Sequence, residues 1–341
     1  MQKPLKICII GCGRVAQSHG EGVLASNGAV ELTAIVSRTE EKRKAFQNKF
    51  NVPNAYADID EALASGTFDA VDICLPNHLH TEYAIKCAQA GKHILLEKPM
   101  ANTVAECKLI NEACRKNGVT LMVGQSRRYH EAVMLSKKLY DEGKIGEVIS
   151  VTGTLMGYLA SPPTDWWRSS EKAGGLMIPL WGNHILDYIL YIFEEMPLRV
   201  YCEAYSNNTE WEGEDETTIL LGFSKDRFAT VRMSWNTRLA PEKEWVGKTK
   251  MLSSSDILYE RFVQGTKGTL RLNDETKLSL NGETIFDNKN AKNNFATQYE
   301  EFAASIFEGR KPLTDGESGV GLIRIQEAAL ESYRTHKVVE L

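Results

Sequence analysis

A glycine-rich turn between an apolar strand and a helix restricts the fold of this chain more than any other feature. Residues 5–10 form a continuous apolar run, as expected of a parallel strand that is covered on both faces. The turn that follows has the spacing GxGxxA and consists of Gly11, Cys12, Gly13, Arg14, Val15 and Ala16. The first glycine permits the turn, the second lets the backbone approach a pyrophosphate, and the alanine lets a helix pack on the strand. The pattern predicts a dinucleotide bound at the amino end of that helix.

The rest of the first 124 residues alternates strands with helices. Further strands are predicted over residues 30–36, 70–75, 94–97 and 119–123, and helices over residues 40–50, 59–65, 81–90 and 104–117. This alternation indicates an α/β domain with a doubly wound parallel sheet, in which ligands bind at the carboxyl ends of the strands. We therefore predict a dinucleotide-binding domain over residues 1–124.

The second strand ends in Ser37 and Arg38, where an NAD-preferring site normally has an acidic residue for the ribose hydroxyls. A hydroxyl group and a guanidinium suit a 2′-phosphate. We therefore predict NADP as the preferred cofactor. Glu40 and Glu41 follow closely and keep NAD as the alternative, and a solvated Arg38 is the alternative without a binding role.

Another strand end carries a polar loop. The strand that stops at Leu75 is followed by Pro76, Asn77 and, a little later, His80. Asn77 and His80 are predicted to contact the ribose or the nicotinamide of the cofactor. Capping of the next helix is the alternative role for the histidine.

Lys98 stands between Glu97 and Pro99, directly after an apolar strand. Proline lacks an N–H and fixes its own φ, which ends the strand and keeps the preceding lysine extended. A lysine at this edge of the sheet can donate to a reacting oxygen, or release a proton if its surroundings lower its pKa. A solvated Glu-Lys loop is the alternative, and the neighbouring motifs favour the catalytic interpretation.

Composition excludes several classes of function. A chain of 341 residues suits two domains. The net charge of -5 and a pI near 5.9 give no basic footprint for nucleic acid. An apolar run of about 20 residues is not evident in the sequence, so no membrane span is predicted. The first strand begins so close to Met1 that no signal peptide is expected, and the predicted location is cytoplasmic.

The cysteines are scattered and form no CxxC pair. They are Cys8, Cys12, Cys74, Cys87, Cys107, Cys114 and Cys202. Several lie within apolar strand or helix patterns, which predicts buried reduced thiols rather than disulfides or a metal site.

From Gln125 the pattern changes to long strands without crossover helices. Strands are predicted over residues 148–158, 199–205, 217–223, 228–235, 257–264 and 269–272. This predicts an α+β domain over residues 125–341 with a large open, mostly antiparallel sheet. One face of such a sheet stays uncovered, and from it we expect a homodimer or homotetramer.

One helix interrupts these strands and carries His184. Pro179 is tolerated only near a helix start, which puts His184 in about the second turn. The positive end of a helix favours a neutral imidazole, and a general base needs that form. Asp187 and Tyr188 share the face of His184. The alternative is a histidine whose hydrogen bonds are satisfied in the core.

The loop before this helix contains Trp166, Trp167 and Arg168. These residues are predicted either to cover a nicotinamide or sugar ring, or to anchor the loop by packing. The acidic run over residues 210–216 is predicted to be a solvated turn.

Taken together, the motifs resemble those of the glucose-fructose oxidoreductase, inositol dehydrogenase and rhizopine-catabolism family, written Gfo/Idh/MocA. The matching features run in order through nearly the whole chain. They are the GxGxxA turn, Leu75-Pro76-Asn77 with His80, Glu97-Lys98-Pro99, Arg128-Tyr129, Gly143-Lys144-Ile145-Gly146, Trp167-Arg168, Gly174-Gly175, His184 with Asp187, and the helix of Glu327-Ala328 to Ser332.

The resemblance implies a Rossmann domain, a carboxyl-terminal α+β domain, a nicotinamide cofactor and a secondary alcohol or carbonyl substrate, commonly a sugar, inositol or related polyol. It implies that His184 accepts the hydroxyl proton while Lys98 stabilises the charge that develops on the oxygen. Further substrate contacts are expected from Arg128, Tyr158 and Asn183. Cofactor contacts are expected from the GxGxxA turn, the strand-end residues, Glu97, Lys98, Trp167 and Arg168.

One position departs from the family pattern. The family usually has an aspartate four residues before the histidine, where this chain has Leu180, and the third glycine of its glycine run is Leu176. Without that carboxylate nothing obvious orients His184, and loss of such a group can cost orders of magnitude in rate. Two alternatives to a dehydrogenase stay open. One is a regulatory sensor that binds dinucleotide and sugar without turnover, and the other is a redox-neutral glycosidase that uses tightly held NAD.

Overall fold

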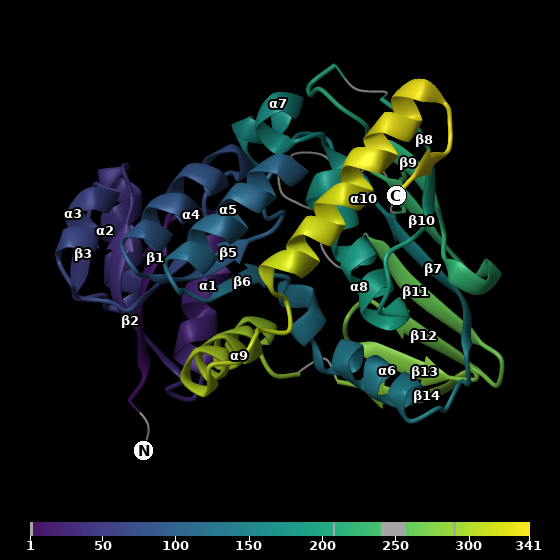
Figure 1. Cartoon of the computed structure of the whole chain (residues 1–341), viewed down its shortest axis with the longest axis horizontal. Coiled ribbons are helices and arrows are strands. Elements are labelled where there is room, and N and C mark those ends of the chain that lie inside the picture. Colours follow the sequence, from purple (N-terminus) through teal and green to yellow (C-terminus); the bar gives the residue numbers. More distant parts are fainter. Residues whose placement is uncertain (1–2, 207–208, 240–256, 289–290) are drawn as a thin grey trace. The chain divides into compact units, whose positions relative to one another are not determined.

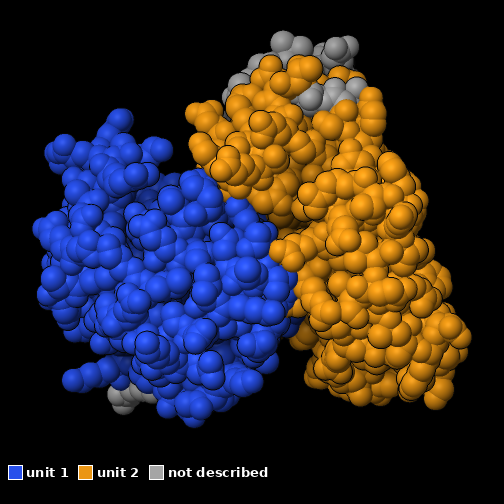
Figure 2. Space-filling view, turned by 45° about the horizontal axis from the view of Figure 1, so that its top comes forward, with its two compact units in different colours: residues 1–129, 292–320 blue, residues 130–291, 321–341 orange. Residues whose placement is uncertain are grey.

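The computed structural model describes residues 3–206, 209–239, 257–288 and 291–341. The chain forms two compact units (Figure 2), the first made of Met1–Tyr129 with Lys292–Val320 and the second of His130–Ala291 with Gly321–Leu341. The change from the first unit to the second follows Tyr129, five residues after the predicted boundary, and a segment near the carboxyl end also belongs to the first unit. Its helix α9 (Asn294–Glu308) packs on α1 (Arg14–Ala25), a contact between distant parts of the sequence.

The first unit contains a parallel sheet of six strands in the order β3-β2-β1-β4-β5-β6 (Figure 1). This order confirms the predicted doubly wound α/β fold. The strands are β1 (Leu5–Ile10), β2 (Val30–Val36), β3 (Asn54–Tyr56), β4 (Ala70–Ile73), β5 (His93–Glu97) and β6 (Leu121–Gly124). Besides α1 and α9, the helices are α2 (Glu40–Phe50), α3 (Ile59–Ala64), α4 (His80–Gln89) and α5 (Val104–Lys116).

The central strands of this sheet are buried, as expected when helices cover both faces. Ile9 of β1 and Leu95 of β5 have no exposed surface. Between them on β4 lies Asp72, which is also fully buried and whose Cα pairs with both neighbours. A buried carboxylate in an apolar layer needs hydrogen bonds or a counter-charge.

The second unit contains a sheet of nine strands in the order β14-β13-β12-β11-β7-β10-β9-β8-β15. Its neighbouring strands are antiparallel except β7 and β10, which confirms the mostly antiparallel prediction. The predicted strands are β7 (Val148–Met156), β8 (Arg199–Tyr205), β9 (Glu216–Gly222), β10 (Phe228–Ser234), β11 (Leu258–Gly265) and β12 (Thr269–Asn273). The strands that were not predicted are β13 (Lys277–Leu280), β14 (Glu283–Asp287) and β15 (Val339–Glu340).

Helices pack on one face of this second sheet. They are α6 (Glu131–Asp141), α7 (Ser170–Ala173), α8 (Asn183–Phe193) and α10 (Gly316–Thr335), the last of which begins in the segment assigned to the first unit. Ile185 of α8 and Ile325 of α10 join Val151 and Val231 of the sheet in one buried core. Alternate residues of each strand point toward this covered face, and these are the apolar ones.

The segment Ser170–Phe193 is long and apolar enough to cross a membrane by length and composition alone, a property that the sequence analysis overlooked. However, 83% of its most apolar window is buried inside the protein. A helix that is hydrophobic on all sides is expected when it lies within a core.

Tryptophan rings anchor the loop that precedes this segment. Trp167 stacks on Trp235 with 5.7 Å between ring centroids and 6° between ring planes. Trp181 and Trp211 meet Trp235 edge-on at 6.0 and 5.9 Å. These offset and edge-on geometries are the favoured ones for aromatic pairs, so the rings fix the loop to Trp235, directly after β10.

All seven cysteines are free and buried, which confirms the prediction of reduced thiols. Burial raises the pKa of Cys114, of Cys87 and of Cys202 to about 12. These three therefore remain neutral thiols at physiological pH.

Candidate functional site

The GxGxxA turn joins β1 to α1 as predicted. Gly11 has a φ of +100°, and a Cβ atom there would lie 2.6 Å from the carbonyl oxygen of Cys74, so only glycine fits. Cys12 is buried, which raises its pKa to about 11. A Cβ atom on Gly13 would meet no atom of the described residues within 4 Å. Ala16 is fully buried, which allows the close approach of helix and strand.

The amino end of α1 suits an anionic group. Among the described residues, no side chain caps this helix and no acidic residue lies in its first turn. Its first N–H groups and the helix dipole therefore favour a phosphate. Arg14 is exposed at the first helical position and Val15 packs partly into the core beside it. The residues present fit the pyrophosphate of a dinucleotide.

The end of β2 has a second arginine that the sequence analysis missed. Arg43 donates from Nη1 to the carbonyl oxygen of Ser37 over 2.6 Å. Arg38, the predicted residue, is exposed next to it. Glu40 pairs with Lys44 over 2.5 Å on the surface of α2. Arg43 lies one helical turn into α2, so its side chain can point back toward the end of β2, and this spacing is a signal that the sequence contains.

His80 holds two strand-end loops together. It is fully buried, with Nδ1 2.9 Å from the carbonyl oxygen of Pro99 and Nε2 2.8 Å from that of Leu75. Burial lowers the pKa of His80, and the two carbonyl groups oppose this shift. Pro76 is partly buried and Asn77 is buried in the same loop, at the short helix Asn77–Leu79. Cofactor contacts by these residues stay predictions.

Lys98 follows the last residue of β5 and is partly buried. Burial lowers its pKa to about 8, because the charged ammonium group loses hydration. The carboxylate of Glu97 opposes this shift, while the guanidinium groups of Arg127 and Arg14 add to it. Lys98 can therefore exist in both protonation states close to neutral pH.

A buried polar group below Lys98 was not predicted, and we call it the His19 cluster. His19 lies with Nδ1 2.7 Å from Oδ2 of Asp72 and Nε2 3.0 Å from Oε1 of Glu97. The hydroxyl group of Tyr299 donates to the same Asp72 oxygen. The signal available in the sequence was Asp72 itself, since a charge inside a buried strand needs a partner.

The atoms of His19, Asp72 and Cys74 that could bind a metal lie within 4.8 Å of one another. The 2.7 Å between Nδ1 of His19 and Oδ2 of Asp72 is nevertheless a hydrogen-bond distance. That oxygen also accepts from Tyr299, and a zinc ion would have to lie about 2.0–2.2 Å from each ligand atom. The geometry is that of a hydrogen-bonded cluster.

In the second unit, the segment that carries His184 begins with a wide π turn over Ile178–Gly182, before α8. His184 is the second residue of α8 and is partly buried, while Asn183 and Asp187 are buried. Leu180 is 3% exposed and belongs to the hydrophobic core. An apolar core residue therefore occupies the position of the family's aspartate.

The acidic run after β8 is buried at its centre, so the prediction of a solvated turn was wrong for Glu214 and Asp215. Oε1 of Glu214 accepts hydrogen bonds from the backbone N–H groups of Ile178 at 2.8 Å and Leu176 at 3.2 Å. Burial raises the pKa of Glu214, and these N–H groups oppose the shift. The free N–H groups before α8 supplied partners that the local sequence could not reveal.

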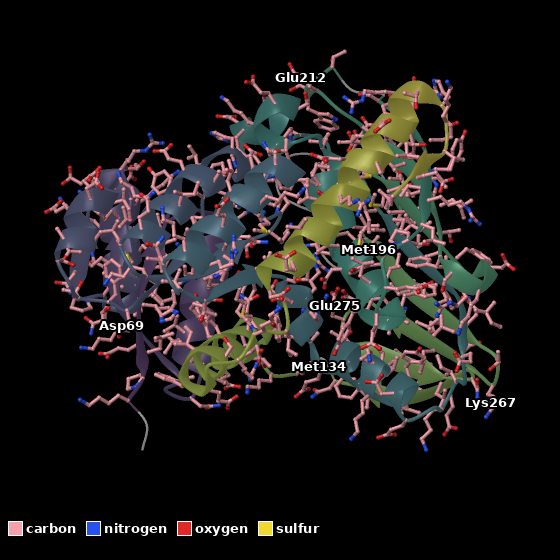
Figure 3. The ribbon with its side chains drawn as sticks, viewed as in Figure 1. Asp69, Met134, Met196, Glu212, Lys267 and Glu275 are labelled. Atoms are coloured by element: carbon pink, nitrogen blue, oxygen red, sulfur yellow. The ribbon has the colours of Figure 1, made fainter. Side chains whose placement is uncertain are left out.

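Neighbouring members of the same run hold the tryptophan loop. Arg168 donates from Nη1 to Oε2 of Glu210 over 2.8 Å. Glu212, labelled in Figure 3, accepts from the backbone N–H of Ser170 over 3.0 Å. Trp167 is buried in the core, which agrees with the alternative that it anchors the loop by packing. Cofactor contacts by Trp167 and Arg168 stay predictions.

The remaining candidates for substrate binding lie in different units. Arg128 donates from Nη1 to the carbonyl oxygen of Leu313 over 3.1 Å within the first unit. In the second unit, the guanidinium group of Arg238 lies 4.3 Å from the ring centroid of Tyr158. Their substrate contacts stay predictions.

Two family models match the chain. Residues 5–125 match the oxidoreductase family with an NAD-binding Rossmann fold, and residues 133–271 match the GFO/IDH/MocA C-terminal domain. The chain belongs to the Gfo/Idh/MocA oxidoreductase family. It is thus an oxidoreductase whose first unit binds a nicotinamide dinucleotide.

Individual members of the Gfo/Idh/MocA family are similar over nearly the whole chain. The scyllo-inositol 2-dehydrogenase (NADP(+)) IolW of Bacillus subtilis is 26% identical, over 99% of this chain and 96% of the relative. The D-xylose 1-dehydrogenase (NADP(+)) 2 of Haloferax volcanii is 28% identical, over 91% of this chain and 92% of the relative. The structure of aldose-aldose oxidoreductase from Caulobacter crescentus, complexed with glycerol, superposes with a TM-score of 0.85 at 25% identity, over 99% and 100% of the two chains.

Proposed function

We propose that the protein transfers hydride between NADP and a secondary alcohol or carbonyl group of a sugar, inositol or related polyol. The observation that carries the proposal is Lys98, a lysine with a pKa of about 8 at the carboxyl end of β5, in the same sheet as the dinucleotide turn. Relatives named as inositol and xylose dehydrogenases support the substrate class.

Lys98 acts on the substrate oxygen. As an ammonium group it donates a hydrogen bond to that oxygen and stabilises the negative charge that develops there. A pKa of about 8 also lets it exchange a proton with the oxygen near neutral pH. When bound, the nicotinamide ring accepts or supplies the hydride.

His184 is assigned the role of proton acceptor in the oxidation direction, as the family resemblance implies. Its position at the start of α8 is supported from below by Glu214, which binds the backbone before the helix. Leu180 occupies the position at which the family usually has an aspartate. We assign the larger share of proton and charge control to Lys98, whose pKa of about 8 suits proton exchange near neutral pH.

The preference for NADP rests on the charges around the end of β2. Arg38 is exposed, and Arg43 approaches Ser37 from the first turn of α2. Two guanidinium groups at one strand end suit the 2′-phosphate of NADP. Glu40, the acidic residue that would favour NAD, is paired with Lys44. The NADP-dependent relatives support the same preference.

Nicotinamide absorbance at saturating NADP, and separately NAD, tests this function against a panel of sugars, inositols and sugar acids. We expect turnover with at least one polyol, a higher kcat/KM with NADP, and loss of turnover in Lys98→Met. Lys108→Met, at an exposed position on α5, is the matched control and should keep full activity. Turnover that survives in Lys98→Met would refute the role of Lys98.

Leu180 favours one alternative, a sensor that binds dinucleotide and sugar without turnover. An apolar residue in place of the orienting carboxylate would suit a protein released from catalysis. Cofactor binding measured by fluorescence, together with no absorbance change across the panel, would favour the sensor. Cofactor that co-purifies and stays in one redox state during sugar cleavage would instead favour the redox-neutral glycosidase.

Self-association and a cytoplasmic location stay predictions. One face of the sheet in the second unit is covered by helices. The other face carries three exposed apolar residues, Leu220, Phe228 and Leu258. Exposed apolar residues that share one sheet face favour contact with a second copy of the chain. Light scattering of the purified protein, compared with Leu220→Arg, tests for a dimer or tetramer.

A further inference from the structure

The His19 cluster lies wholly within the first unit and brings together four elements. His19 comes from α1, Asp72 from β4, Glu97 from β5 and Tyr299 from α9. All four side chains are buried, with at most 6% of the residue exposed. The cluster is too enclosed to bind a substrate, so its function must be exerted through a neighbour.

Both nitrogen atoms of His19 face carboxylate oxygens, at 2.7 and 3.0 Å. A neutral imidazole has one N–H and could donate to only one of them, whereas an imidazolium donates to both. Burial alone would lower the pKa of His19, but Asp72 and its hydrogen bond raise the pKa well above its ordinary value. The geometry and the electrostatics therefore agree on a buried cation between two carboxylates.

Glu97 connects this cation to Lys98. Its Oε1 atom faces His19, and its Oε2 atom accepts the backbone N–H of Lys98 over 3.2 Å. Glu97 is also the group that holds the pKa of Lys98 up, against burial and the charges of Arg14 and Arg127. The position of the Glu97 carboxylate is thus a direct influence on Lys98.

We propose that His19 is a positioning residue that holds the carboxylate of Glu97 in place beside Lys98, and so influences the protonation of Lys98. This inference rests on the function proposed above for Lys98. Without His19, Oε1 of Glu97 loses its partner in a buried layer, and the side chain is expected to leave this position. A displaced carboxylate no longer favours the ammonium form of Lys98.

The other groups that face the cluster do not replace His19. The thiol of Cys74 lies 3.7 Å from Oδ1 of Asp72, and burial keeps it neutral. The ring of Phe295 packs on His19 with 4.7 Å between centroids. Tyr299 donates to Asp72 as a neutral hydroxyl, since burial raises its pKa well above the usual value. Among the described side chains of the cluster, His19 is the cation.

The test is the protonation of Lys98 itself, followed in protein without substrate or cofactor. Lysines are methylated with ¹³C-formaldehyde, the signal of Lys98 is assigned by its loss in Lys98→Arg, and its midpoint is followed by NMR from pH 6 to 11. His19→Gln is expected to lower the pH midpoint of Lys98, which corresponds to an acid dissociation constant about tenfold higher. A midpoint that is unchanged or higher in His19→Gln overturns the proposal.

Two further variants separate this effect from general loosening of the cluster. Glu97→Gln should lower the midpoint by a similar amount, and the double variant with His19→Gln should lower it no further, because both act through one carboxylate. Tyr299→Phe is the matched control, since it removes a hydrogen bond to Asp72 and leaves His19 and Glu97 paired. If His19→Gln does not fold, an unchanged midpoint in Glu97→Gln still overturns the proposal.

The measurement does not depend on turnover, so the two proposals can fail separately. A midpoint that falls in His19→Gln, in a protein with no activity on any polyol, would refute the dehydrogenase but support the positioning role. Activity on a polyol combined with an unchanged midpoint would support the dehydrogenase and refute the positioning role of His19. In an active enzyme, the alkaline limb of the pH profile of kcat/KM should move with the NMR midpoint, because the ammonium form of Lys98 is the active one. A merely structural effect would lower the rate at every pH.

Discussion

The two units each bury a carboxylate beneath a candidate functional residue, but they stabilise it differently. In the first unit, Glu97 lies under Lys98 and is paired with the cation of His19. In the second unit, Glu214 lies under the segment that leads to His184 and is bound by backbone N–H groups. The first carboxylate has a full counter-charge, while the second has only dipoles.

This difference sets what each carboxylate can do. A carboxylate that is paired with a cation stays charged and can influence the protonation of a neighbour. A carboxylate held by N–H groups in a buried place has a raised pKa, as Glu214 does, and serves mainly to hold the backbone. We therefore expect the electrostatic control of catalysis to come from the first unit and the support of helix α8 to come from the second.

The largest expected effect is on activity, and it compares the two functional residues directly. Lys98→Met should lower kcat by about 10³-fold or more, because charge stabilisation and proton transfer are lost together. His184→Ala should cost less, about 10²-fold, because it removes proton transfer alone and leaves the charge stabilisation by Lys98 in place. Steady-state kinetics with the best polyol measure both. A larger loss in His184→Ala would reverse the proposed division of roles.

The next effect is on stability and tests the cation-paired carboxylate. His19→Gln removes one partner of a buried charge pair, which typically costs about 3–5 kcal/mol. The reason is that Asp72 and Glu97 remain in the core without their counter-charge. Urea unfolding at pH 7 measures the loss, with Gln17→Ala on the partly exposed side of α1 as a control. A loss below about 1 kcal/mol would show that His19 is not charged in the folded protein.

The dipole-bound carboxylate should tolerate a neutral replacement. Glu214→Gln keeps an acceptor for the N–H groups and should change stability by no more than about 1 kcal/mol at pH 7, whereas Glu214→Leu should cost about 1–3 kcal/mol. Because the folded-state pKa of Glu214 is raised, its stabilising contribution is complete below the unfolded value and is lost as pH rises through the folded value.

The stability of the wild type relative to Glu214→Gln should accordingly fall as pH rises above about 4.5. Thermal unfolding of both proteins between pH 4 and pH 8 measures this difference. A relative stability that instead rises with pH would mean that Glu214 is stabilised as an anion.

Local sequence was sufficient for the elements around the dinucleotide turn. The apolar run of residues 5–10 and the GxGxxA spacing predicted β1 and the start of α1 because turn, strand and helix are adjacent in the chain. The strand-end position of Lys98 followed from the same logic. In contrast, β14 was missed because its residues are mostly exposed and give no alternating apolar pattern.

The buried partners of Asp72 and Glu214 could not be predicted from the sequence, for a physical reason. Tyr299 is 227 residues from Asp72, so no local pattern connects them. Glu214 lies in an acidic run that looks solvated, and its partners are backbone N–H groups that the sequence does not display. Burial of a polar side chain is decided by distant partners, whereas strand and helix formation is largely decided by neighbours.

A gain of stability is expected in the variant that loses most activity. The pKa of Lys98 is lowered from 10.5 to about 8, so the folded protein binds a proton there less tightly than the unfolded chain does. Its contribution to stability is therefore present above pH 10.5 and is lost as pH falls through 8. At pH 7 the buried ammonium group opposes folding, and Lys98→Met should be more stable than the wild type by about 1–3 kcal/mol. That advantage should shrink as pH rises from 8 toward 10, which urea unfolding at several pH values can follow. Equal stability at every pH would mean that Lys98 is hydrated in the folded protein, and the cation-paired Glu97 would then have no desolvated lysine to control.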